Sequence, residues 1–126
     1  WVRFWSQSPR HDRTVSINPN ILKGSFISLA QHLPKRYISL LIWLCTRHIS
    51  LNQHLFRISR SPMPNCSHCA TTAETVLHFL ITCPHYARTH HILMSALCHC
   101  ASSISYLLSS PKASAPLHMD INWIFF

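Results

Sequence analysis

The sequence predicts a small all-α domain that is stapled by one structural metal ion and flanked by irregular N- and C-terminal tails. Apolar residues recur at helical spacing in one segment after another, and little alternating β pattern is present. The 126 residues include a single glycine, which fits a chain of successive helices better than one of tight hairpins. A closely spaced group of cysteine and histidine residues near the middle of the chain supplies the expected ligands of that metal ion.

Residues 1–21 mix aromatic, basic and turn-forming residues without a clear period, so we expect an extended linker. Trp1, Phe4 and Trp5 are suited to stacking on nucleic-acid bases. They are equally suited to packing on a domain that precedes them. The chain begins at Trp1 and not at Met, which suggests a fragment of a longer reading frame.

A helical module is expected over residues 22–109. Its first helix covers residues 22–33, and Pro34 then begins the most regular helix, over residues 34–48. The expected stripe of that second helix consists of Ile38, Leu41, Leu44, Cys45 and His48, widened by Leu40 and Trp43. Further helices are predicted at 51–58 and 84–100, and a short segment follows at 104–108. Residues 110–126 are expected to form a tail with a loop between its two prolines.

The four residues Cys66, Cys69, His78 and Cys83 form the pattern Cys-x2-Cys-x8-His-x4-Cys. Three thiolates and one imidazole complete the tetrahedral shell of Zn²⁺ and leave no position for a substrate water. The pattern therefore predicts a structural zinc site, in which a tight turn supplies the first two ligands and a second element supplies the others.

The expected second element is a helix that begins near Thr72, because Thr71 and Glu74 match a Ser/Thr-x-x-Glu capping box. Pro84 should end it at Cys83. Residues five apart on a continuous α-helix point about 140° away from each other. His78 and Cys83 can therefore share one ion only if the backbone turns between them.

Other interpretations of the cysteines stay open. Six cysteines permit three disulfides, although nothing resembles a secretory signal, which favours an intracellular location, nuclear or cytoplasmic. Buried free cysteines are also common, and Cys45 fits that description. A second metal cluster could form from His91, Cys98, His99 and Cys100, but Cys-x-Cys is a poor spacing for it.

The chain is strongly basic, with a net charge of +8, and all lysines and arginines except Arg88 and Lys112 lie within residues 1–60. Such a surplus favours a polyanionic partner, most simply RNA or DNA bound non-specifically through its phosphates. A solvated basic surface without a partner is the alternative. The longest apolar run is far shorter than the roughly 20 residues that a membrane-spanning helix needs, although a basic helix lying on a membrane surface stays open.

Catalysis is not expected. Nuclease or polymerase chemistry requires several carboxylates to hold Mg²⁺. The chain has only Asp12, Glu74 and Asp120, which are scattered, and it has no glycine-rich phosphate loop.

Residues 37–93 resemble the region that follows the ribonuclease H domain in fungal non-LTR retrotransposon reverse transcriptase polyproteins. Besides the metal motif, the shared elements are Thr46, His48, Leu51, Asn52, His54-Leu55, Arg57-Ile58, Glu74-Thr75-Val76, His78-Phe79-Leu80, Cys83-Pro84 and Tyr86. The segments Ser8-Pro9-Arg10 and Ser109 to Lys112 also look like elements of that family. One departure is Arg47, where the family has a helix-ending glycine.

The resemblance implies a zinc-binding accessory segment with Cys66, Cys69, His78 and Cys83 as ligands. We expect it to be non-catalytic and to contact nucleic acid through Arg36, Arg47, Arg57 and Arg60. Two alternatives remain: a protein-docking module that packs on the upstream ribonuclease H domain through Trp1, Trp5 and the 22–33 helix, or an inert remnant of a decayed element. The nucleic acid type, base specificity and oligomeric state do not follow from the sequence.

Overall fold

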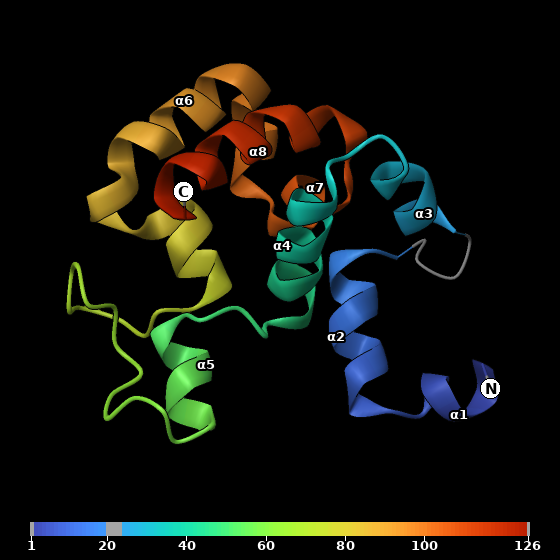
Figure 1. The fold of residues 1–126 in the computed structure, drawn as a ribbon, viewed down its shortest axis with the longest axis horizontal. Helices are drawn as coiled ribbons and strands as arrows, with labels where there is room; N and C mark the ends of the chain where they lie inside the picture. The colour runs from blue at the N-terminus through green and yellow to red at the C-terminus, as the bar shows by residue number, and fades with distance from the viewer. Residues whose placement is uncertain (1, 20–23, 126) are drawn as a thin grey trace.

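The computed structural model describes residues 2–19 and 24–125, and within these residues it is helical without a β-strand (Figure 1), so the predicted all-α fold is confirmed. Its α-helices are α1 (Val2–Ser6), α2 (Pro9–Ile17), α3 (Ser25–Ala30), α4 (Lys35–Thr46), α5 (Asn52–Arg57), α6 (Ala87–Leu97), α7 (Ile104–Ser109) and α8 (Pro111–Phe125). Shorter turns are the π-helical η2 (His78–Thr82) and the 3-10 turns η3 (Pro84–Tyr86) and η4 (Cys98–Ser102). None of the described helices is long and apolar enough to cross a membrane.

Helix α4 lies near the centre of the fold, in contact with α2 on one side and α7 on another (Figure 1). Its buried residues are Tyr37, Leu40, Leu41 and Leu44, which repeat at intervals of three and four. The predicted stripe is therefore right for the leucines. It is wrong for Trp43, which is 49% exposed, and for His48, which is exposed beyond the end of α4. The covered face lies one position earlier, because it begins at Tyr37 rather than at Ile38.

The predicted C-terminal tail is instead the long helix α8, which packs on α6 and α7. Pro111 occupies its first position, where a proline is tolerated because that N–H has no helical partner. Ala113, Leu117 and Ile121 then recur every four residues, each with no exposed surface. Burial of this stripe outweighs the cost of Pro116 inside the helix.

The extended linker expected over residues 1–21 is wrong for residues 2–6, which form α1, and for residues 9–17, which form α2. Ser8 caps this helix by accepting a bond from the N–H of Arg10, and Pro9 follows at the first helical position. Ile17 is buried at its end, and α2 packs on α4 and α7. Trp1 and residues 22–23, which belong to the surface of the docking alternative, lie outside the described residues.

The metal motif connects two parts of the fold. Residues 58–75 form a looped segment after α5, and η2 and η3 lead from it into α6 (Figure 1). Phe79 and Leu80 of η2 belong to the same buried core as α4, α7 and α8. The segment with the predicted ligands is therefore attached to the core from its C-terminal side.

Candidate metal centre

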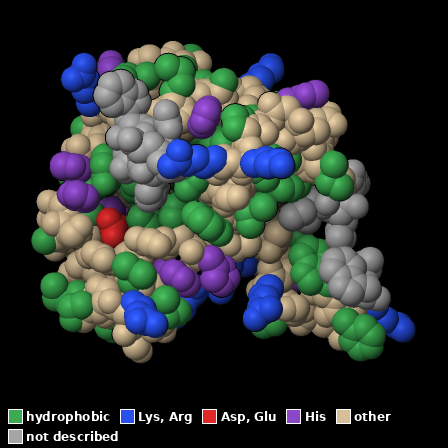
Figure 2. All heavy atoms as spheres, in the orientation of Figure 1, with side chains coloured by type: hydrophobic (Ala, Val, Ile, Leu, Met, Phe, Trp, Pro, Cys, Tyr) green, Lys and Arg blue, Asp and Glu red, His purple; other side chains and the backbone are tan. Residues whose placement is uncertain are grey.

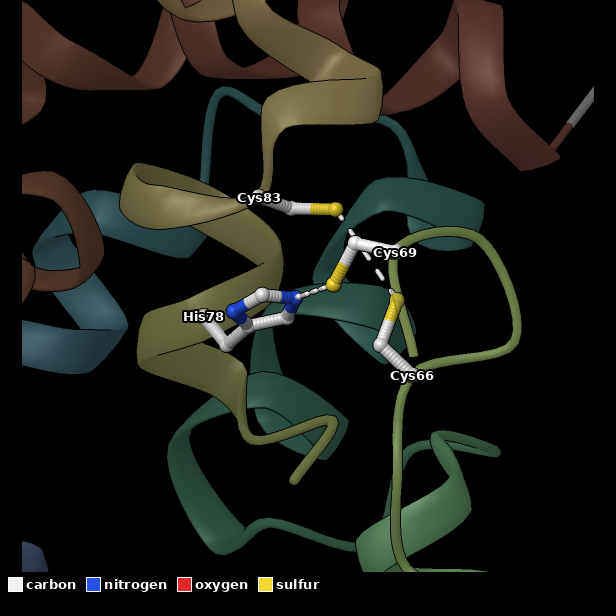
Figure 3. A group of neighbouring side chains, drawn as sticks. All are labelled: Cys66, Cys69, His78 and Cys83. Carbon is white, nitrogen blue, oxygen red and sulfur yellow. Dashed lines mark hydrogen bonds between the residues drawn. The ribbon is translucent and has the colours of Figure 1, made fainter. Parts of the chain in front are cut away.

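The four predicted ligands converge. One ligand atom from each of Cys66, Cys69, His78 and Cys83 lies within 4.8 Å of all the others (Figure 3). The Sγ atoms of Cys66 and Cys83 are 3.8 Å apart, and Nε2 of His78 lies 3.3 Å from Sγ of Cys69. Three of the four side chains are buried and Cys69 is half-buried. This arrangement can hold a metal ion away from bulk water.

A tight turn presents the first two thiols, as the Cys-x2-Cys spacing predicted. The N–H of Ala70 donates to the carbonyl of Cys66, and the N–H of Cys66 donates to the carbonyl of Thr72, both at 2.9 Å. Ala70 has a φ of +53°, a left-handed conformation that lets the chain reverse within a few residues. An isolated antiparallel bridge between Asn65 and Ala73 closes the base of the turn.

The predicted capping box at Thr71 and Glu74 is wrong, because residues 71–75 are not helical. The helical turns begin at residue 76, and the hydroxyl of Thr75 caps them by accepting a bond from the N–H of His78 at 3.0 Å. The sequence does contain a capping threonine, because Thr75 stands three residues before His78. It lies four positions after Thr71, where the cap was expected. The Glu74 carboxylate turns instead toward a segment 22 residues earlier.

A π-helical turn brings His78 and Cys83 together. In η2 the N–H of Cys83 donates to the carbonyl of His78 at 2.8 Å, five residues back. A π turn contains more residues than an α turn, so a side chain five positions later returns toward the same face instead of pointing away. Cys83 itself is extended, with ψ of 121°, as a residue before proline should be. The expected backbone turn therefore begins within the helix and ends at Cys83-Pro84.

Two threonines orient the imidazole of His78. Its Nδ1 lies 3.0 Å from Oγ1 of Thr72 and 3.1 Å from Oγ1 of Thr82. When Nδ1 carries the proton and donates to these hydroxyls, Nε2 is free to bind a metal on the side of the three thiols. Thr82 could be found from sequence, because it lies four residues after His78 on the same helical face. Thr72 could not, because the turn geometry brings it there.

The thiols differ in their readiness to ionise. The hydroxyl and the N–H of Thr71 bond to Cys69 and lower the pKa of its thiol to about 6. Burial raises the pKa of Cys66. The half-buried Cys69 is therefore the thiolate that is available near neutral pH, and a metal cation would favour ionisation of the buried thiols in turn.

The structure separates the four arginines that the sequence suggested for phosphate contacts. Arg47 and Arg57 lie together, because Nη2 of Arg57 is 3.5 Å from the carbonyl of Arg47 and both line one cavity of about 470 Å³. Arg36 lies 11 residues before Arg47 on α4, about 16 Å along the helix axis. Arg60 is exposed beyond the end of α5.

Histidines accompany the arginine pair. Nη2 of Arg57 donates to Nδ1 of His54 at 2.8 Å, so that nitrogen acts as an acceptor. Burial, together with the charges of Arg57 and His48, lowers the pKa of His54. The rings of His48 and His54 are in edge contact, with centroids 5.3 Å apart.

The cysteines near the end of α6 do not join a metal site. Within the described part of the chain, Cys66, Cys69, His78 and Cys83 are the one group with ligand atoms clustered closely enough. Cys98 is exposed, and the Sγ atom of Cys100 lies 3.7 Å from Nε2 of the neighbouring His99. The second cluster considered from the sequence is therefore not supported.

Comparison of the chain with protein-family models, with curated proteins and with solved structures finds no match.

Proposed function

We propose that this chain is a non-catalytic zinc-binding module that contacts RNA or DNA non-specifically through its phosphates. We further propose that it is an accessory segment of a non-LTR retrotransposon reverse transcriptase polyprotein. The convergence of four soft and borderline ligands within 4.8 Å is the observation on which the proposal depends. The resemblance of residues 37–93 to that polyprotein region supports the second part.

Zinc fits the ligand set better than other common metals. Thiolate and imidazole are the ligands of structural Zn²⁺, whereas Mg²⁺ and Ca²⁺ require oxygen ligands. Three cysteines and one histidine complete a tetrahedral shell, which leaves no open position for substrate. The ion would therefore act by joining the Cys66–Cys69 turn to η2, and through Cys83 to the start of α6.

The basic surface supports nucleic acid as the partner. Arg47 and Arg57 line the same cavity, and their guanidinium groups suit phosphate oxygens. The described residues that line this cavity include no carboxylate, and Glu74 nearby in the sequence is only 7% exposed. The net charge of +8 would also steer a polyanion toward the chain from a distance.

Protein docking is a second candidate, favoured by two exposed apolar residues near the N-terminus. Phe4 on α1 is 81% exposed and Ile27 on α3 is 73% exposed. Such residues would be covered if the module packed on a ribonuclease H domain. Binding of that kind would respond weakly to salt, whereas phosphate-led binding weakens log-linearly as salt rises.

Metal content and nucleic-acid binding should be measured on the same purified, reduced sample. We expect one zinc per chain and binding to mixed-sequence RNA and DNA at 50 mM salt that falls steeply by 200 mM. Metal content near zero would contradict the zinc assignment. Absence of any binding at low salt would contradict the nucleic-acid assignment and favour docking.

A further inference from the structure

Two basic cavities lie on either side of one backbone corner at the end of α4. The first, of about 470 Å³, is lined by Arg47, His54 and Arg57 among others. The second, of about 340 Å³, is lined by Trp5, Arg10, Arg13, Thr14, Thr46 and His48. Thr46, Arg47 and His48 are consecutive, so the two cavities adjoin. Figure 2 shows Lys, Arg and His side chains around the hollow between α5 and the α1–α2 part of the molecule.

Imidazole side chains connect the two cavities. His48 lines the second cavity and His54 the first, and their rings touch edge to face. A ligand that crosses from one cavity to the other would therefore pass over this histidine pair, with arginines from α2 on one side and from α5 on the other.

The backbone of Arg47, at this corner, is strained. Arg47 ends α4 in the left-handed region, with φ of +60° and ψ of +30°, while the N–H of His48 donates to the carbonyl of Trp43. Glycine takes this position without strain, and arginine does not. Strain of this kind is found at functional sites, and the strained residue here lines a cavity that also contains Arg57.

We propose that these two cavities form a continuous path for single-stranded nucleic acid, with Arg10 and Arg13 binding phosphates on one side of the corner and Arg47 and Arg57 on the other. This inference rests on the proposed nucleic-acid function and names its site and ligand class. A duplex is read by a helix or ribbon that enters its groove, whereas this surface is concave. Cavities of this size fit single nucleotides or similarly small groups, and Trp5 gives one cavity an aromatic wall.

Arg10 and Arg13 were not among the arginines selected from the sequence, because residues 1–21 were expected to be a linker. Their placement follows from α2, which presents positions 10, 13 and 14 on one face, three and four residues apart. Asp12 lies off that face and contacts His11.

The test is fluorescence anisotropy of the zinc-loaded full chain with mixed-sequence 12-nucleotide RNA, the equivalent DNA strand, and duplex DNA, at 50 and 200 mM salt. The variant Arg10→Gln/Arg13→Gln should bind single strands about tenfold more weakly at 50 mM salt. Its salt slope should be shallower by about 1.4, because two phosphate contacts are lost. The control Arg88→Gln/Lys112→Gln removes the same charge from α6 and α8, across the molecule from α5 (Figure 1), and should change affinity far less.

A third variant separates binding from folding. Arg47→Gly should weaken single-strand binding while its urea midpoint stays unchanged or rises, because glycine relieves the left-handed strain. Equal losses in the α2 variant and its control would overturn the proposed path, as would duplex binding tighter than single-strand binding. Failure of the unmodified chain to bind any of the three probes would instead overturn the proposed nucleic-acid function.

Discussion

The carboxylate of Glu74 accepts a 2.7 Å hydrogen bond from the backbone N–H of Asn52, which lies 22 residues earlier in the chain. Its other oxygen lies 3.7 Å from Sγ of Cys66. The side chain of Asn52 in turn donates to the carbonyl of Asn65 at 2.7 Å. One buried carboxylate thus joins the first turn of α5 to the turn that carries Cys66 and Cys69, the first two predicted metal ligands.

Replacing Glu74 by alanine should lower the free energy of unfolding of the metal-loaded chain by about 2 kcal/mol. The variant removes the acceptor of a part-buried hydrogen bond and leaves the N–H of Asn52 without its partner. Glu74→Gln keeps an acceptor oxygen and should cost less. Urea denaturation of the three chains side by side measures both values. Equal free energies of unfolding for all three chains would show that the hydrogen bond between Glu74 and Asn52 does not contribute to stability.

Removing the threonine hydroxyls around His78 should weaken metal binding. We expect Thr72→Val/Thr82→Val to lower zinc affinity by about 10- to 100-fold, since groups that orient a ligating imidazole typically contribute that much. Competition with a chromophoric chelator measures the change. Thr46→Val is the matched control, because its hydroxyl bonds only to a backbone carbonyl of α4, and it should leave the affinity unaltered.

Chelation should release the metal turn and η2 before the rest of the core. The Cys66–Cys69 turn and η2 are joined by few backbone bonds, and binding of structural zinc is typically coupled to folding with an apparent free energy of about 10–16 kcal/mol. Hydrogen exchange after chelation should therefore rise first in residues 64–83.

The serine variant Cys69→Ser should reproduce the effect of chelation, and Cys98→Ser should leave metal content and exchange unchanged. Full metal content in Cys69→Ser would contradict the ligand assignment.

The clustering of Cys66, Cys69, His78 and Cys83 could be predicted from sequence because it depends on residue types and local spacing. Cys-x2-Cys fits a tight turn, and Pro84 marks where the second segment must bend. The way in which His78 and Cys83 converge could not be predicted. It depends on a change from α-helical to π-helical hydrogen bonding, which the residue types in this segment do not indicate. The capping box failed for a different reason: Glu74 found a partner in Asn52, and such a tertiary contact overrides a local motif.

The expected tails at both ends of the chain are wrong because proline is compatible with the start of a helix. Pro9 and Pro111 each begin a helix, a position that proline favours. Burial of apolar side chains stabilises both helices. Ile17 is buried in α2, and Ala113, Leu117 and Ile121 form the buried stripe of α8. Since α2 is ordered, the arginines that it carries can contribute to a binding surface, which a flexible linker would do less well.

Cys45 should make the fold sensitive to alkaline pH. Burial raises the pKa of its thiol to about 12, whereas an unfolded thiol ionises near 8.5. Between these values the unfolded chain loses a proton that the folded chain keeps, so the free energy of unfolding should fall as pH rises. Urea denaturation from pH 8 to 10.5 should show a shallower decline in Cys45→Ala. The same thiol should react with iodoacetamide more slowly than the exposed Cys98.

Arg57 and Arg60 should contribute unequally to nucleic-acid binding, although both closely precede the metal turn. The guanidinium of Arg57 contacts His54 and the carbonyl of Arg47, so it is held at the cavity wall and loses little entropy when a phosphate binds. Arg60 is exposed beyond the end of α5 and does not line that cavity.

We therefore expect Arg57→Gln to weaken binding to all sequences alike and to reduce the salt slope by about 0.7 for single strands, the change expected for one phosphate contact. Arg60→Gln removes the same charge and should reduce the slope by clearly less. Anisotropy titrations of both variants at several salt concentrations make the comparison. If the two substitutions shift affinity and slope equally, binding depends on net charge rather than on the cavity at Arg47 and Arg57.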